Sequence, residues 1–205
     1  HWRYGQGITS AAGLVSQWDD DTGLGHHLVQ ATGTNQPTLE ADGSITFDGT
    51  DNFMATAAFA IAQPYTSYSL MRQITWSAGD RILDGVGGVA NTPSIRQTTA
   101  GASPDLTLNA GADVGPLQTL AVNVYGVLYA VVNGASSILG ANTSTAITGD
   151  AGASGLTGIT LGCTSAGAAF SNIQYKEHIL FSAAHDAATR DRVIRYLSQV
   201  GQLGL

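Results

Sequence analysis

Apolar and polar residues alternate along most of this chain in short segments, and glycines stand between the segments. Alternation with a period of two is typical of strands with one buried face, and glycine-rich connections are typical of turns. In the segment 66–76 one face holds the apolar side chains, with Arg72 as the exception: Tyr68, Leu70, Ile74 and Trp76. The pattern therefore predicts many short strands joined by turns.

Later segments repeat the alternation. Residues 117–126 predict a strand through Leu120, Val122 and Val124, and residues 127–131 predict the next one. Asn133-Gly134 then separates two apolar runs, which predicts a hairpin because both residues tolerate a positive φ.

The segment 172–181 predicts the last strand, with four apolar side chains on one face: Ile173, Tyr175, Ile179 and Phe181. Glu177 falls on that apolar face. A carboxylate is costly to bury without a partner. We therefore expect Glu177 either near a strand edge or paired with an arginine.

Only residues 183–200 have apolar positions at helical spacing, namely Val193, Tyr196 or Leu197, and Val200. Ser182 or His185-Asp186 can supply the N-terminal cap, and Gly201 is a natural stop. One short amphipathic helix after about ten strands predicts a lid across a sheet edge or end.

Composition narrows the possible partners. The chain has 205 residues, which suits a single domain at positions 1–205 with residues 1–12 as an N-terminal extension. Its formal net charge is −7 and only 11% of residues are charged, so we expect no basic patch of the size that nucleic-acid binding requires. No apolar run reaches the ~20 residues that span a bilayer, so we expect no membrane partner.

Other features bear on cellular context. The single cysteine, Cys163, cannot form an internal disulfide and is expected to be a buried apolar residue. Because the sequence begins with His1, we expect that upstream residues, and a localisation signal with them, were removed. Trp2 and Tyr4 are expected to pack against a neighbouring chain or an upstream segment.

Aspartates and histidines gather in the first quarter of the chain. Carboxylate oxygens are the ligands that calcium prefers, and Asp and Asn equally cap turns through backbone amides. Turn capping is the favoured interpretation, and no cofactor is expected apart from a weakly indicated structural calcium at Asp19, Asp21, Asp48 and Asp51. Other candidates for that cluster are Asp20, His26, His27 and Asn52.

Several motifs occur in an order that resembles a known family. These are WDDDTGLGHHL at 18–28, FDGTDNF at 47–53, an RILDG turn at 81–85, VVNG at 131–134 and GITLG at 158–162. In this order they resemble the concanavalin A-like, laminin-G-type domains of phage virion proteins and of bacterial surface or polysaccharide-binding proteins. The resemblance implies an all-β, two-sheet antiparallel jelly-roll sandwich with one short C-terminal helix, and it carries no activity by itself.

A catalytic set is not evident. Hydrolases of this superfamily carry a Glu-x-Asp-x-x-Glu set on one strand, whereas Glu40 and Glu177 stand alone here. Tyr175, Lys176 and His178 resemble a lyase motif only weakly. We therefore predict that the protein is not an enzyme. The alternative is a divergent polysaccharide lyase or hydrolase.

Glycan binding needs an aromatic platform and fixed polar groups. Aromatic candidates include Tyr125, and polar candidates include Gln73 and Asn123. The predicted ligand-binding residues are Arg72, Trp76, Tyr129, Lys176 and His178.

The sequence thus predicts a lectin-like or structural module on a virion surface or outside the cell, such as a phage decoration protein or tail appendage. It would form a homo-oligomer and contact other virion or surface proteins or a polysaccharide. The alternative is a carbohydrate-binding module of a secreted bacterial protein.

Overall fold

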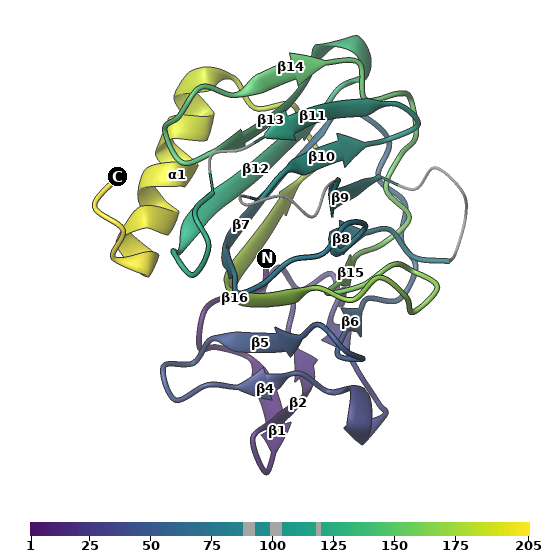
Figure 1. Cartoon of the computed structure of the whole chain (residues 1–205), viewed down its shortest axis with the longest axis vertical. Coiled ribbons are helices and arrows are strands. Elements are labelled where there is room, and N and C mark those ends of the chain that lie inside the picture. Colours follow the sequence, from purple (N-terminus) through teal and green to yellow (C-terminus); the bar gives the residue numbers. More distant parts are fainter. Residues whose placement is uncertain (88–92, 99–103, 118–119) are drawn as a thin grey trace.

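The computed structural model describes residues 1–87, 93–98, 104–117 and 120–205 (Figure 1). Its strands are β1 (Ile8–Ala11), β2 (Leu14–Trp18), β3 (Leu28–Val29), β4 (Thr38–Leu39), β5 (Ile45–Asp48), β6 (Met54–Ala55), β7 (Tyr65–Gln73) and β8 (Arg81–Asp84). They continue as β9 (Ser94–Gln97), β10 (Leu106–Asn109), β11 (Asp113–Leu117), β12 (Gly126–Val132), β13 (Ser137–Ala141), β14 (Ile147–Gly149), β15 (Thr160–Leu161) and β16 (Asn172–Phe181). Two short 3₁₀ helices, Gly33–Asn35 and Gly134–Ser136, and the α-helix α1 (Ala187–Gly201) complete the described elements.

The strands form one large antiparallel sheet in the order β11-β10-β9-β8-β15-β6-β3-β2-β4-β5-β16-β7-β12-β13-β14, with β1 paired to β2. The sheet curls until β11 lies against β13 and β14, so it is nearly closed. The prediction of an all-β chain with one short C-terminal helix is confirmed. The finer division into two jelly-roll sheets stays a prediction, because these ladders join the strands into one sheet.

Apolar side chains are buried on both faces of the central strands. The larger cluster fills the inside of the curled sheet and contains Trp18, Phe47 and Tyr175. The smaller cluster lies between α1 and the outer face of β7, β12 and β16, and it contains Tyr68, Leu70 and Leu197. Burial on both faces explains why β12 is buried at all seven positions.

Helix α1 follows its sequence signals closely. Asp186 is the N-cap, since its side chain accepts a hydrogen bond from the Thr189 backbone N–H at 2.8 Å. The helix ends at Gly201, after which Gln202 adopts φ 55°. However, α1 covers the outer face of β7 and β12 rather than a sheet edge or end, because its buried Ile194 and Leu197 belong to the smaller cluster.

Three local predictions need correction or adjustment. The RILDG segment is not a turn, because Arg81–Asp84 forms β8 between β15 and β9. The strand predicted at 117–126 is not formed: Leu117 ends β11, residues 120–125 form a turn with Asn123 at φ 58°, and Gly126 begins β12. Residues 118–119 of that prediction lie outside the described residues. The hairpin at Asn133-Gly134 is confirmed, although a 3₁₀ turn lengthens its connection and only Gly134 has a positive φ.

A β-bulge explains the anomalous position of Glu177. The register between β16 and β7 shifts between Tyr175 and Glu177, so Lys176 is the extra residue of β16. Tyr175 before the bulge points into the larger cluster, whereas Ile179 after it belongs to the cluster beneath α1. The predicted single apolar face from Ile173 to Phe181 is therefore wrong.

Candidate functional site

The N-terminal residues complete the central sheet. Along β16, strand β5 pairs with Asn172–Tyr175 and no further. Beyond that point Trp2 takes the place of β5, donating from its N–H to the His178 carbonyl at 2.9 Å and accepting from the His178 N–H at 3.0 Å. The Trp2 side chain is only 2% exposed and packs in the larger cluster. The expectation that Trp2 packs against another chain or an upstream segment is therefore wrong.

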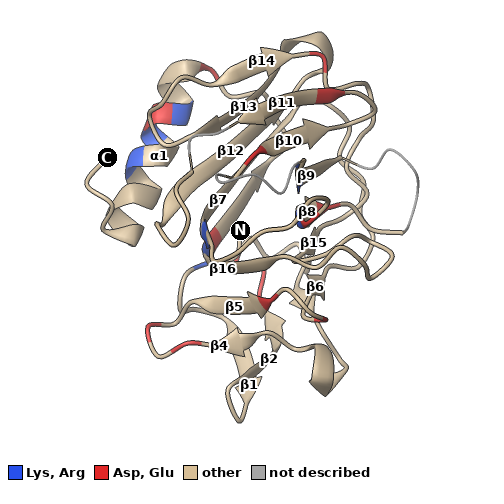
Figure 2. Cartoon of the chain, in the orientation of Figure 1, with Lys and Arg blue, Asp and Glu red and all other residues tan. Residues whose placement is uncertain are grey.

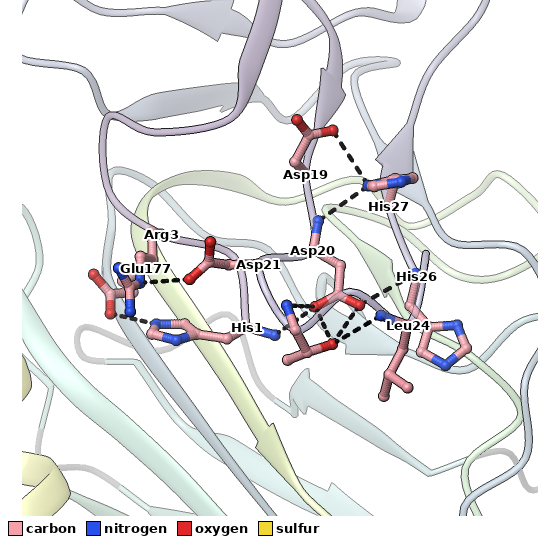
Figure 3. A network of polar contacts seen from close by, with 10 residues as sticks. His1, Arg3, Asp19, Asp20, Asp21, Leu24, His26, His27 and Glu177 are labelled. Atoms are coloured by element: carbon pink, nitrogen blue, oxygen red, sulfur yellow. Dashed lines mark hydrogen bonds and ion pairs between the residues drawn. The ribbon is translucent and has the colours of Figure 1, made fainter.

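Asp20 organises the loop that follows β2 (Figure 3). Its carboxylate accepts hydrogen bonds from the Thr22 backbone N–H at 3.0 Å, the Thr22 hydroxyl at 2.7 Å and the His26 N–H at 3.3 Å. The His1 amino nitrogen lies 3.0 Å from the same carboxylate. Burial alone would raise the pKa of Asp20, but the hydrogen bonds from Thr22 and the neighbouring His1 amino group together outweigh it and lower this pKa to about 2. Asp20 is thus an ionised anchor for both loop and N-terminal segment.

Glu177 anchors the other side of the N-terminal segment. It accepts from the Tyr196 hydroxyl at 2.7 Å and from the Tyr4 N–H at 3.3 Å, and His1 Nε2 lies 2.7 Å from its Oε1. Its side chain is 2% exposed, and burial raises its pKa although the bonds from Tyr196 and Tyr4 oppose the shift. The predicted strand-edge position or arginine pair is wrong: Glu177 lies on a central strand and hydrogen-bonds to Tyr196 of α1.

Two adjoining cavities of about 290 and 460 Å³ open beside this network, and together we call them the N-terminal groove. His1, Thr22 and Leu180 line both cavities. In the smaller cavity the rings of His26 and Phe59 are stacked, with centroids 4.1 Å apart. The other lining residues are Trp2, Asp20, Leu24, Ala60, Ile61 and Ser182 in the smaller cavity and Ile179, Phe181, Arg192, Val193 and Tyr196 in the larger.

The groove therefore combines apolar and aromatic walls with a few fixed polar groups. Thr22 is held by Asp20, and Tyr196 is held by Glu177, so their positions do not depend on a ligand. Leu24 and Tyr196 are 71% and 40% exposed, which leaves apolar surface open to a ligand. Such a mixture is characteristic of small-molecule and sugar sites.

The carboxylates considered for calcium serve other contacts. Asp48 accepts from the Thr50 N–H at 2.8 Å and so caps its turn. Asp51 accepts from the side-chain amide of Asn52, Asp21 pairs with Arg3, and Asp19 accepts from Gln17. Within the described ranges no group of three or more His, Cys, Asp or Glu side chains has the arrangement of a metal site.

The five predicted ligand-binding residues do not form one site. Arg72 and Lys176 come together over the Tyr125 ring, 5.0 and 4.4 Å from its centroid. Tyr129 lies beneath α1, and His178 is fully buried, which lowers its pKa to about 3. Trp76 is half-buried beyond the end of β7.

Sequence patterns miss the groove because its residues come from segments without periodicity. Phe59 and His26 lie outside the strands, and only the folded chain brings them together. Tyr196 was expected on the apolar helix face, but its hydroxyl is what reaches Glu177. The one available signal was Glu177 itself, since a carboxylate on an apolar face requires polar partners above it.

Comparisons with known proteins give a likeness in fold. No protein-family model matches the chain, and no curated protein matches it. Among solved structures, an arabinofuranosidase in complex with arabinofuranosyl-α-1,2-xylobiose is similar with a TM-score of 0.68 and 11% identity over 90% of this chain and 50% of that one. Trypanosoma rangeli sialidase has a TM-score of 0.66 and 12% identity over 94% of this chain and 32% of that one.

The binding domain of botulinum neurotoxin serotype G is also similar, with a TM-score of 0.63 and 9% identity over 88% of this chain and 49% of that one. The chain thus spans half or less of each of these chains. At these identities the likeness shows the sheet-rich fold. It is not specific to the concanavalin A-like or phage proteins that the motifs resemble.

These comparisons overturn one prediction. The chain was expected not to be an enzyme, yet the arabinofuranosidase and the sialidase are glycoside hydrolases. The missing Glu-x-Asp-x-x-Glu set excludes one arrangement on one strand. It does not exclude carboxylates that meet from distant segments, as Asp20 and Glu177 both meet His1.

Proposed function

We propose that this chain is a glycan-recognition domain of a carbohydrate-active protein, built on a concanavalin A-like sandwich, and that it binds a saccharide in the N-terminal groove. The observation that carries the proposal is the groove itself, in which the His26–Phe59 stack and Tyr196 stand beside Thr22, His1 and Ser182. The fold likeness to an arabinofuranosidase and a sialidase supports it.

The physical argument rests on the two sides of a sugar ring. The C–H face of a sugar packs on aromatic or apolar side chains, and its hydroxyls need hydrogen-bond partners that are already oriented. The Asp20 and Glu177 networks supply that orientation before binding. Preorganised groups bind more tightly because less conformational entropy is lost on association.

Calorimetric titration with arabinofuranosyl-xylooligosaccharides and sialyl-oligosaccharides tests the proposal. Phe59→Ala is expected to weaken binding roughly tenfold, because an aromatic contact of about 1.5 kcal/mol is lost. Phe170→Ala is the matched control, since Phe170 is likewise half-buried and lies outside the groove. Equal affinities for the two variants would refute the groove as the binding site.

One further observation favours hydrolysis as a second candidate function. Asp20 and Glu177 have pKa values displaced in opposite directions, and pairs with divergent pKa values can divide the acid and base roles in glycoside cleavage. Glu177 would be the acid and Asp20 the carboxylate. Binding remains the first proposal because both side chains are only 2% exposed and already hydrogen-bonded.

Product release from the same oligosaccharides separates the two functions. Glu177→Gln and Asp20→Asn are each expected to abolish release if the pair is catalytic. Release that persists in both variants would exclude these two roles. The virion location and the homo-oligomer stay predictions. Light scattering on the purified chain would test the homo-oligomer. Identifying the proteins that neighbour the chain in its native assembly would test the virion location.

A further inference from the structure

A separate cavity of about 440 Å³ lies between α1 and the β12–β13 pair, away from the N-terminal groove. We call it the helix pocket. Its size is within the range of small-ligand sites. Its polar lining residues are Tyr129, Asn142, Thr143, Ser144, Arg190, Asp191 and Arg195, and its apolar ones are Ala146, Ile194 and Leu205.

Tyr129 forms part of the pocket wall and has an unused hydroxyl. The residue is 5% exposed, and no residue in the described part of the chain hydrogen-bonds to its hydroxyl. Gly140 leaves room for that group, since a Cβ there would stand 2.3 Å from the hydroxyl oxygen. Because Tyr129 lines the pocket and its hydroxyl has no partner among the described residues, this hydroxyl is a donor available to a ligand.

Two arginines of α1 line the same pocket. Arg190 donates one N–H to the His185 carbonyl at 2.9 Å, and its guanidinium carbon lies 5.9 Å from the Tyr129 ring centroid. Arg195 makes no hydrogen bond or ion pair with the described residues. Guanidinium groups offer several donors in a plane, so both retain N–H groups for a ligand.

The charge of the pocket is opposite to that of the whole chain. Two arginines stand against one acidic residue, Asp191, in the lining, whereas the chain carries a formal net charge of −7. Figure 2 shows that α1 carries one of the few groups of basic residues on an otherwise acidic chain. A local positive potential of this kind attracts anions and repels cations.

We propose that the helix pocket binds the anionic group of a small ligand, namely the carboxylate or sulfate of an acidic saccharide. Arg195 and Arg190 would hold the oxygens in charge-assisted hydrogen bonds, and the Tyr129 hydroxyl would donate to the same group. Ile194 and Ala146 provide an apolar wall for the remainder of the ligand. This site is distinct from the N-terminal groove, and its anion contacts do not depend on the function proposed for that groove; the choice of a saccharide as the carrier of the anion rests on that proposed function.

Titration of the full chain with glucuronate, glucose and inorganic sulfate tests the assignment. Glucuronate is expected to bind, with an affinity that falls as ionic strength rises, and uncharged glucose is expected not to bind in the pocket. Arg195→Gln and Tyr129→Phe should each weaken glucuronate binding, the first by roughly tenfold to a hundredfold because a hydrogen bond to a charged group is lost. Arg96→Gln, which makes the same charge change on β9, should leave binding unchanged.

Each outcome decides the proposal. If inorganic sulfate binds and Arg195→Gln abolishes that binding, the pocket is still an oxyanion site, and free inorganic anions are among its ligands. Equal binding of glucose and glucuronate would overturn the proposal, as would no binding of any probe or wild-type affinity in Arg195→Gln. Since Tyr129→Phe keeps the ring, an unchanged melting temperature in that variant shows that its loss of binding is not a loss of folding.

Discussion

Replacing Trp2 with alanine is the sharpest test of how the N-terminal segment is held. Trp2 is 2% exposed, belongs to the larger hydrophobic cluster and pairs through its backbone with His178. A buried aromatic side chain removes about 150–250 Å² from water. At roughly 25 cal/mol per Å² this corresponds to about 4–6 kcal/mol, close to the ~3–5 kcal/mol typical of Trp→Ala changes in a core.

Urea unfolding followed by circular dichroism would measure this loss as a lower midpoint with an unchanged slope. Trp2→Phe is the graded control, because a phenyl ring keeps most of the apolar contact and should lose less stability than alanine. Both variants keep the backbone pairing to His178, so the difference between them reports the side chain.

A small effect of Trp2→Ala would refute this reasoning. A loss below about 1 kcal/mol is the size expected of a surface substitution, and it would mean that residues 1–4 contribute little to the folded state. Amide exchange at Trp2 and Tyr4 then gives an independent answer, since loosely held residues exchange quickly. If residues 1–4 are loosely held, His1 and Trp2 do not form a fixed wall of the N-terminal groove, and the groove should bind glycans only weakly.

Three further outcomes are expected. Burial raises the Glu177 pKa above its usual 4.5, so the wild type loses stability as pH rises from 4.5 through the folded-state pKa. Glu177→Gln should remove this loss. The difference in melting temperature between the two proteins should therefore change across that pH range. Gly140→Ala should destabilise the fold by about 1–3 kcal/mol in chemical denaturation, because its Cβ would stand 2.2 Å from the Tyr129 ring, and Tyr129→Ala in the same chain should recover part of the loss. Leu197→Ala should cost about 2–5 kcal/mol by the same measurement, since Leu197 is fully buried between α1 and the sheet; a loss under 1 kcal/mol would mean that α1 is not packed as described.

Much of the fold could be predicted from the sequence because it depends on local signals. The alternation in β12 and the Asn133-Gly134 turn define a hairpin within a short stretch of chain. The Asp186 cap and the apolar spacing define α1 in the same way. The burial expected of Cys163 from its residue type is confirmed, and that burial raises the pKa of its thiol to about 12.

The candidate sites could not be predicted because they depend on contacts between distant segments. The bulge at Lys176 reverses which face Glu177 and His178 occupy, and the pattern of apolar residues alone does not reveal an inserted residue. Tyr129 was a sensible candidate from its residue type, but its surroundings come from α1, which follows more than fifty residues later. A period-two pattern tells which side chains share a face and leaves open what covers that face.

Helix α1 forms a wall of both proposed sites, which decides how each must be tested. Its residues Arg190, Ile194 and Arg195 line the helix pocket, whereas Val193 and Tyr196 line the N-terminal groove. Any substitution that shifts the helix would therefore alter both cavities at once. Two substitutions avoid this problem. Arg195 is exposed, and the half-buried Phe59 lies outside the cluster beneath α1, so neither Arg195→Gln nor Phe59→Ala removes a buried contact of α1. If each site exists as proposed, Arg195→Gln should weaken glucuronate binding and leave arabinofuranosyl-xylooligosaccharide binding unchanged, and Phe59→Ala should do the reverse.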